Sequence, residues 1–197
     1  MINDVLGIVL KPKTYLQGLE SKSHGPFWGV IYTAVLSLFP PMAFYWGTTV
    51  QGWEVGSRTI KIEAGNAFWL AVFFYLALIT GTICTGVLVS WISRTYTEKI
   101  ATAKGVETIA LCATPMFLSG LGAIYPVLWF DILLATTAAA YAIYLIYLSL
   151  NVHLKISEEK SFLYTCATLA FISVAAICVM GATAIAWEFM ATPTFIG

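Results

Sequence analysis

The chain has 197 residues, of which 59% are hydrophobic and 10% charged, and its ten basic and ten acidic residues give no net charge. This balance leaves no polybasic region for nucleic acid, and no stretch between the apolar runs is long enough for a soluble catalytic domain. The four cysteines fall inside apolar runs, without C-x-x-C spacing or a nearby histidine. The sequence therefore predicts no metal site, no disulfide framework and no cofactor.

Residues 1–25 are predicted to form an amphipathic segment ahead of the first long apolar run. Apolar residues recur on one helical face before and after a break at Lys11-Pro12, namely Val5, Leu6, Val9, Leu10, Tyr15, Leu16 and Leu19. Lysines flank both pieces, which suits a helix lying in the headgroup region of the cytoplasmic leaflet. The pattern equally suits a short helix that packs on the ends of a helix bundle.

Five long apolar runs follow, and each is long enough to cross a hydrocarbon core of about 30 Å as a helix. The sequence predicts an all-α fold, a polytopic membrane helix bundle over residues 26–190, with a tail at 191–197. The five transmembrane helices are expected at 26–47, 67–93, 106–125, 127–150 and 162–190. In the loop after the first span, residues 58–63 alternate at period two behind a turn, which predicts a small hairpin within 49–63.

Basic residues predict the orientation of this bundle. Eight of the ten lysines and arginines lie on the side that carries the N-terminus, and Arg58 and Lys61 lie on the other. The positive-inside rule therefore places the N-terminus in the cytoplasm and the C-terminus outside. Six tryptophans stand at the predicted membrane interfaces: Trp28, Trp46, Trp69, Trp91, Trp129 and Trp187.

Acidic residues inside spans are the first functional candidates, because a charge is costly there. Glu107 and Asp131 each lie about one turn into a span, in the third and the fourth respectively. A helix N-terminus favours a carboxylate at such a position, so each is either a first-turn charge at the interface or part of a polar path.

The third span has a proline near its middle. Pro115 leaves the carbonyl of Leu111 without its helical partner, so the helix is predicted to kink or break there. Glycines and a further proline loosen the second half of this span, which suits a broken helix whose carbonyls face a polar cavity. The alternative is an ordinary kink in which Thr114 or Ser119 bonds the freed carbonyl.

On the fourth span, Tyr141, Tyr144 and Tyr147 share one helical face, which turns either to a neighbouring helix or to a cavity. The candidate polar and hinge site comprises Glu107, Thr114, Pro115, Ser119, Gly120, Tyr125, Pro126, Asp131, Tyr141 and Tyr144.

Residues 113–121, followed by Tyr125-Pro126 and Trp129, resemble the corresponding stretch of small bacterial inner-membrane proteins of the Yip (Ypt-interacting protein) family. Residues 47–53 are similar to the same proteins, and five spans with a cytoplasmic N-terminus agree with them. The resemblance does not extend to the Asp-Leu-Tyr-Gly-Pro signature of eukaryotic members, because Gly25-Pro26 follows Lys22, Ser23 and His24 here. Binding to Rab-type GTPases is therefore not implied.

This resemblance implies a non-enzymatic, multi-pass protein of the inner (plasma) membrane with a membrane-organising or scaffold role. Its expected partners are the lipid bilayer and either a second copy of the chain or another membrane protein. The residues also admit an alternative, a small transporter or channel that uses the broken third span and Asp131. A continuous polar cavity that reaches Pro115 and Asp131 would favour this alternative.

Overall fold

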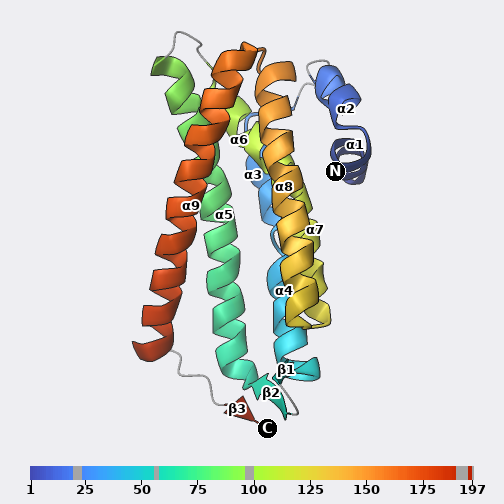
Figure 1. The fold of residues 1–197 in the computed structure, drawn as a ribbon, viewed down its shortest axis with the longest axis vertical. Helices are drawn as coiled ribbons and strands as arrows, with labels where there is room; N and C mark the ends of the chain where they lie inside the picture. The colour runs from blue at the N-terminus through green and yellow to red at the C-terminus, as the bar shows by residue number, and fades with distance from the viewer. Residues whose placement is uncertain (20–23, 56–57, 96–99, 190–194, 197) are drawn as a thin grey trace.

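The computed structural model describes residues 1–19, 24–55, 58–95, 100–189 and 195–196. Within them, five helical stretches are long and apolar enough to cross a membrane, and they run side by side as a bundle (Figure 1). The five are Trp28–Gln51, Ala64–Arg94, Thr102–Ile124, Leu128–Val152 and Glu158–Ile185. The predicted all-α, polytopic bundle is thereby confirmed.

Several elements differ from the predicted ranges. The fifth span begins at Glu158 rather than at residue 162, because Glu158 and Glu159 form an acidic first turn that a helix N-terminus favours. The helices are α1 (Ile2–Leu10), α2 (Pro12–Leu19), α3 (Trp28–Leu36), α4 (Phe39–Trp46), the π-helical turn η1 (Gly47–Gln51), α5 (Ala64–Thr95), α6 (Thr102–Cys112), α7 (Thr114–Ser119), the 3₁₀ turn η2 (Gly120–Ile124), α8 (Leu128–Val152) and α9 (Glu158–Phe189).

The first and third spans are both broken at prolines. Pro115 stands in the first turn of α7, after α6 has ended at Cys112, and the predicted break is confirmed. Pro40 and Pro41 occupy the first turn of α4 in the same way. Proline suits this position because the first N–H groups of a helix have no intrahelical partner. Both spans then end in an irregular helical turn, η1 or η2.

A small antiparallel sheet closes one end of the bundle, and we call this the strand end. The strands β1 (Trp53–Val55) and β2 (Arg58–Ile62) pair as the predicted hairpin, with Trp53 opposite Ile60. A third strand, β3 (Phe195–Ile196), adds to β2 with Ile196 opposite Lys61. The expected C-terminal tail therefore includes a strand, which its sequence did not indicate.

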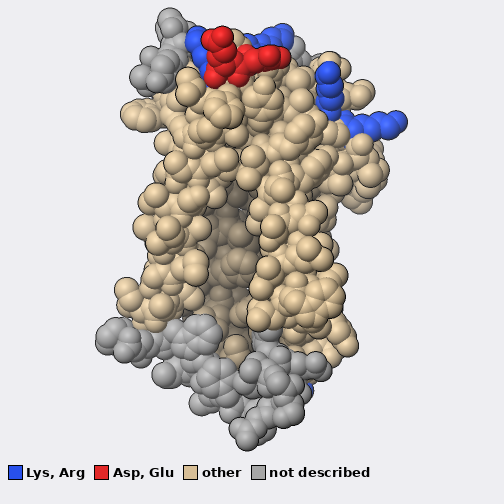
Figure 2. All heavy atoms as spheres, viewed as in Figure 1, with Lys and Arg blue, Asp and Glu red and all other residues tan. Residues whose placement is uncertain are grey.

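Charged side chains gather at the opposite end, which we call the charged end. Figure 2 shows most of the basic and acidic groups of this view at that end, above a long flank of other residues. The lysines, arginine and glutamates that belong to it by their positions in the fold are Lys11, Lys13, Arg94, Lys104, Lys155, Glu158, Glu159 and Lys160. Which end faces the cytoplasm stays a prediction.

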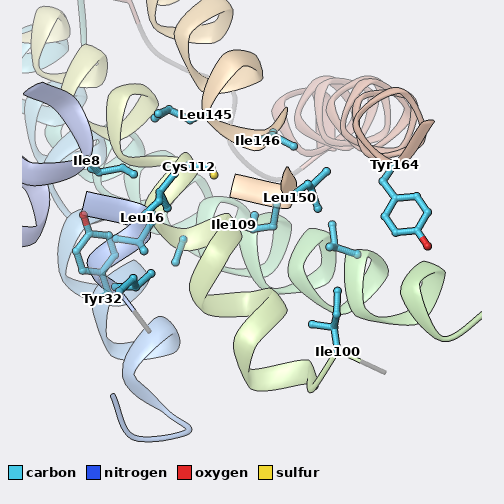
Figure 3. Packing of buried hydrophobic residues seen from close by; sticks show 14 of the residues in the cluster. Ile8, Leu16, Tyr32, Ile100, Ile109, Cys112, Leu145, Ile146, Leu150 and Tyr164 are labelled. Atoms are coloured by element: carbon cyan, nitrogen blue, oxygen red, sulfur yellow. The ribbon is translucent and has the colours of Figure 1, made fainter. Parts of the chain in front are cut away.

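The main buried cluster lies in the half of the bundle nearest the charged end. It joins the N-terminal helices to α3, α6 and α8, and Figure 3 shows its members pointing toward one another: Ile8, Leu16, Tyr32, Ile109, Cys112, Leu145, Ile146 and Leu150. By contrast, the strand-end half of α9 is mostly exposed from Ile172 to Ile185, with only Ala175 partly buried. The fifth span thus packs on the others mainly near the charged end.

The N-terminal helices pack on the flank of the bundle (Figure 1). In α1 the side chains of Asp4 and Ile8 are buried against the bundle, whereas Leu6 and Leu10 point outward. In α2 the predicted face, with Leu16 and Leu19, is the buried one. The predicted apolar face of α1 is therefore divided, because Val5 and Val9 pack partly against the main buried cluster while Leu6 and Leu10 are exposed.

Candidate functional site

Glu107 joins the segment before α3 to the middle of α6. Its Oε1 lies 2.6 Å from Nδ1 of His24, and the two side chains are only 17% and 16% exposed. The His24 ring stacks flat on Trp28, with ring centroids 4.1 Å apart. A Cβ on Gly29 would lie 2.7 Å from the Cα of Glu107, so only glycine lets the two backbones approach this closely.

The break in the third span is filled by paired polar side chains. The Oγ1 of Thr114 lies 2.7 Å from the hydroxyl oxygen of Tyr32 on α3, and neither residue is exposed to solvent. Two residues earlier in the chain, Cys112 Sγ lies 3.3 Å from Ser149 Oγ on α8. Thr114 therefore bonds the neighbouring first span, and Ser119 Oγ donates to the carbonyl of Met116, so both hydroxyls have partners other than the Leu111 carbonyl.

Toward the strand end, glycines bring the first and third spans into contact. A Cβ on Gly120 would lie 2.5 Å from Cβ of Pro40, and one on Gly47 would collide with the carbonyl oxygen of Ala123. Together with the close approach of Gly29 to the backbone of Glu107, these contacts run from one end of the bundle to the other. We call this arrangement of α3, α4 and η1 against α6, α7 and η2 the interlock.

Asp131 lies in the first turn of α8 and faces η2. A Cβ on Gly122 would lie 2.9 Å from its Oδ1, so the glycine leaves room for the carboxyl group. Among the residues that the structure describes, neither carboxyl oxygen has a hydrogen-bond partner. Tyr125, which the sequence placed beside it in one site, is 68% exposed.

The tyrosines of α8 face the N-terminal helix and the outside of the bundle. The hydroxyl of Tyr141 donates to the carbonyl oxygen of Val9 at 2.9 Å, and its ring stacks on Tyr144 with centroids 5.9 Å apart. Tyr144 is itself exposed. Tyr141 therefore turns to a neighbouring helix, as one of the two interpretations of this stripe expected.

The α1 and α2 helices are tied to each other at Tyr15. A Cβ on Gly7 would collide with the Tyr15 ring, so α1 lies directly against it. Burial raises the pKa of the Tyr15 hydroxyl, and the neighbouring carboxylate of Asp4 raises it further. The side chain of Asp4 is buried as well, which places these polar groups between α1, α2 and the bundle.

The ten predicted site residues thus lie in separate places. Glu107 is near the charged end, Thr114 bonds Tyr32 of α3, and Pro115 follows Thr114 in the first turn of α7. Tyr141 turns to α1, and Tyr144 is exposed. The others lie toward the strand end: Ser119, Gly120, Tyr125, Pro126 and Asp131.

The tryptophans at the ends of the spans are Trp28 and Trp91 at the charged end and Trp46, Trp69 and Trp129 at the strand end. The side chain of Trp187 falls outside the described part. Their membrane depth stays a prediction.

Two residues of this region were not predicted as site residues, His24 and Tyr32. The available signal was their helical spacing with Trp28, on which both rings stack. Their partners lie 83 and 82 residues further along the chain, which no local pattern indicates. In the described part of the chain, no three His, Cys, Asp or Glu side chains come close enough together to hold a metal ion.

Comparison with known proteins gives a consistent result. The family model described as Yip1 domain matches residues 6–180. The chain is 31% identical over 159 residues to the "Inner membrane protein YohC" of Escherichia coli strain K12, which is 80% of this chain and 82% of that protein. The protein of the same name from Escherichia coli O6:H1 matches to the same extent. No solved structure matches.

Proposed function

Because the chain belongs to the Yip1 domain family and is a multi-pass protein of the inner membrane, we propose that it organises or scaffolds that membrane and catalyses no reaction. The observation that supports this best is the interlock. Transporters with broken helices bind their substrates at the break. Here the polar side chain at the break, Thr114, is hydrogen-bonded to Tyr32, and both residues are fully buried.

The interlock supports a rigid core more than a moving one. At Gly29 the facing atoms belong to the backbone of α6, which cannot move aside as the end of a flexible side chain can. Spans that rock against each other during transport would have to separate such contacts. A fixed pair of spans instead holds α1, which contacts α6 and α7, in a constant position for contact with lipid or with another membrane protein.

The orientation that we propose for this scaffold follows the basic residues. The charged end faces the cytoplasm and the strand end faces outside, since basic residues are retained on the cytoplasmic side of inner-membrane proteins.

Purified protein in liposomes tests the proposal. We expect no flux of ions or small solutes and no transfer of lipid between leaflets above the level of protein-free liposomes. Crosslinking in native membranes should capture the chain in a complex, either with itself or with another membrane protein. Reproducible flux, abolished by Asp131→Asn in a protein that still folds, would overturn the scaffold proposal.

Asp131 favours the second candidate, a small transporter or channel. Both carboxyl oxygens face the interior beside Gly122 with no partner in the described part of the chain, and an isolated charge is costly there. A cation or a polar solute that paired with this group would relieve the cost. If so, flux should be lost both in Asp131→Asn and in Gly122→Leu, which fills the space in front of the carboxyl group.

A further inference from the structure

The outward face of α1 carries large apolar side chains beside the exposed Asn3, although the inward face of the helix is already buried in the bundle. Ile2, Leu6 and Leu10 follow each other at four-residue spacing and are 78%, 52% and 71% exposed. On the opposite side, Ile8 is fully buried. An exposed row of large apolar side chains is better suited to lipid than to water.

The neighbouring helix α2 differs in this respect. Its inward face carries Leu16 and Leu19, which are buried, while its outward face carries Lys13, Thr14 and Gln17, which are exposed. This is the usual pattern of a helix between an apolar core and water. The two helices therefore meet different surroundings, although only Lys11 separates them.

The position of α1 agrees with this difference. In Figure 1 the spans run vertically, α1 is foreshortened and so runs across them, and it lies further from the charged end than α2. The spans define the direction through the membrane, so α1 lies along the membrane plane beside the bundle. In Figure 2 most of the charged groups of this view lie at the charged end, and the flank below them is largely free of described charged residues.

Contacts with the bundle hold α1 in this place. The Val9 carbonyl accepts a hydrogen bond from Tyr141, Ile8 belongs to the main buried cluster, and Gly7 lies against Tyr15. Free amphipathic helices bind membranes reversibly and fold as they bind. The α1 helix is already folded and fixed, so its outward face is presented to lipid permanently.

We propose that α1 is a fixed wedge, inserted among the lipids of the leaflet at the charged end. A helix in this plane takes up area about 5–10 Å deep in one leaflet only. The protein therefore favours membranes in which this leaflet is convex. The inference rests on the proposed organising function and names its partner, the lipid leaflet itself.

Spin labelling measures where the outward face lies. In a background in which Cys84, Cys112, Cys166 and Cys178 are replaced by alanine, a nitroxide is attached at Leu6→Cys or, as the matched exposed control on α2, at Gln17→Cys. In vesicles that contain anionic lipid, the label at position 6 should be accessible to oxygen and shielded from an aqueous nickel complex, and the control should show the reverse. Equal access of nickel to both labels would overturn the wedge.

The same label distinguishes lipid from a second copy of the chain. If another copy covered this face, spin–spin broadening at position 6 would disappear when unlabelled protein is added in excess. Broadening of this kind would also overturn the proposal, because the face would then be a protein interface.

Curvature sorting tests the consequence. Fluorescent full-length protein is reconstituted into vesicles of mixed diameter, and its density is measured vesicle by vesicle on those with the charged end outward. Density should rise as the diameter falls, and the variant Ile2→Ser, Leu6→Ser, Leu10→Ser should lose this dependence. The matched variant Lys13→Ser, Thr14→Ser, Gln17→Ser on α2 should retain it.

The outcomes separate this inference from the proposed function. Wild-type density that does not depend on diameter, or sorting that persists in the α1 variant, would refute the wedge and leave the scaffold in place. Solute flux would refute the scaffold whatever the sorting. Circular dichroism and gel filtration of each variant show that the bundle is still folded.

Discussion

The hydrogen bond between Tyr32 and Thr114 offers a quantitative test of the interlock. Tyr32→Phe removes one partner and leaves the Thr114 hydroxyl in a site with no exposure, 2.7 Å from where the phenol oxygen had been. Leaving a buried polar group without its partner costs about 1–3 kcal/mol. Bonds between membrane helices average about 0.6 kcal/mol and reach about 1.7 kcal/mol. We therefore expect Tyr32→Phe to lower the free energy of unfolding by about 1 kcal/mol, within the range of these two estimates.

A double-mutant cycle isolates this bond from other effects of the substitutions. Thr114→Val removes the second hydroxyl at nearly constant volume, so the double variant should be more stable than the sum of the single losses predicts, by about 0.6–1.7 kcal/mol. The free energies are measured by unfolding in mixed micelles of detergent and dodecyl sulfate. The cycle of Tyr75→Phe with Thr114→Val is the matched control, because the Tyr75 hydroxyl donates to the Ala34 carbonyl and not to Thr114.

The two cycles together test whether the Tyr32 and Thr114 hydroxyls are hydrogen-bonded. Coupling in the first cycle and additivity in the second would support the interlock as described. Additive losses in the first cycle would show that the two hydroxyls do not bond in the membrane. The support for a rigid core over a mobile break would then be lost.

Three further predictions concern the packing, the orientation and the acid. Gly29→Ala should lower the free energy of unfolding by about 1–3 kcal/mol, since the added Cβ would lie 2.7 Å from the backbone of Glu107. The control Gly81→Ala, where nothing lies within 4 Å of the added Cβ, should be tolerated. Equal losses of the two variants in unfolding experiments would contradict the close approach. Reporter fusions after Lys155 should report the cytoplasm and fusions after Ser57 the outside, and an external signal at Lys155 would reverse the orientation. Asp131→Asn should change the free energy of unfolding by no more than about 1 kcal/mol if the residue acts only as a first-turn charge, and a larger loss would assign it a further role.

The features that could be predicted from the sequence are those with a local cause. Hydrophobic length alone identifies the spans, because a helix must satisfy its own backbone groups across the hydrocarbon core. Pro115 has no N–H, so the third helix had to break near it. The period-two alternation after residue 57 likewise led to β2 and its hairpin.

The tertiary structure alone decided which faces of the helices meet. Apolar periodicity identifies the buried face of a helix in water, but lipid is as apolar as leucine, so lipid-facing and protein-facing sides of a span carry similar residues. The partnership of Tyr32 with Thr114, 82 residues away, therefore had no signature in the sequence. Neither did the orientation of α1, which buries Ile8 and leaves Leu6 and Leu10 exposed, since large apolar residues occur on both faces of that helix. Close packing of small residues, rather than separation of apolar from polar surface, determines how these helices associate, and it depends on shapes that only the assembled bundle brings together.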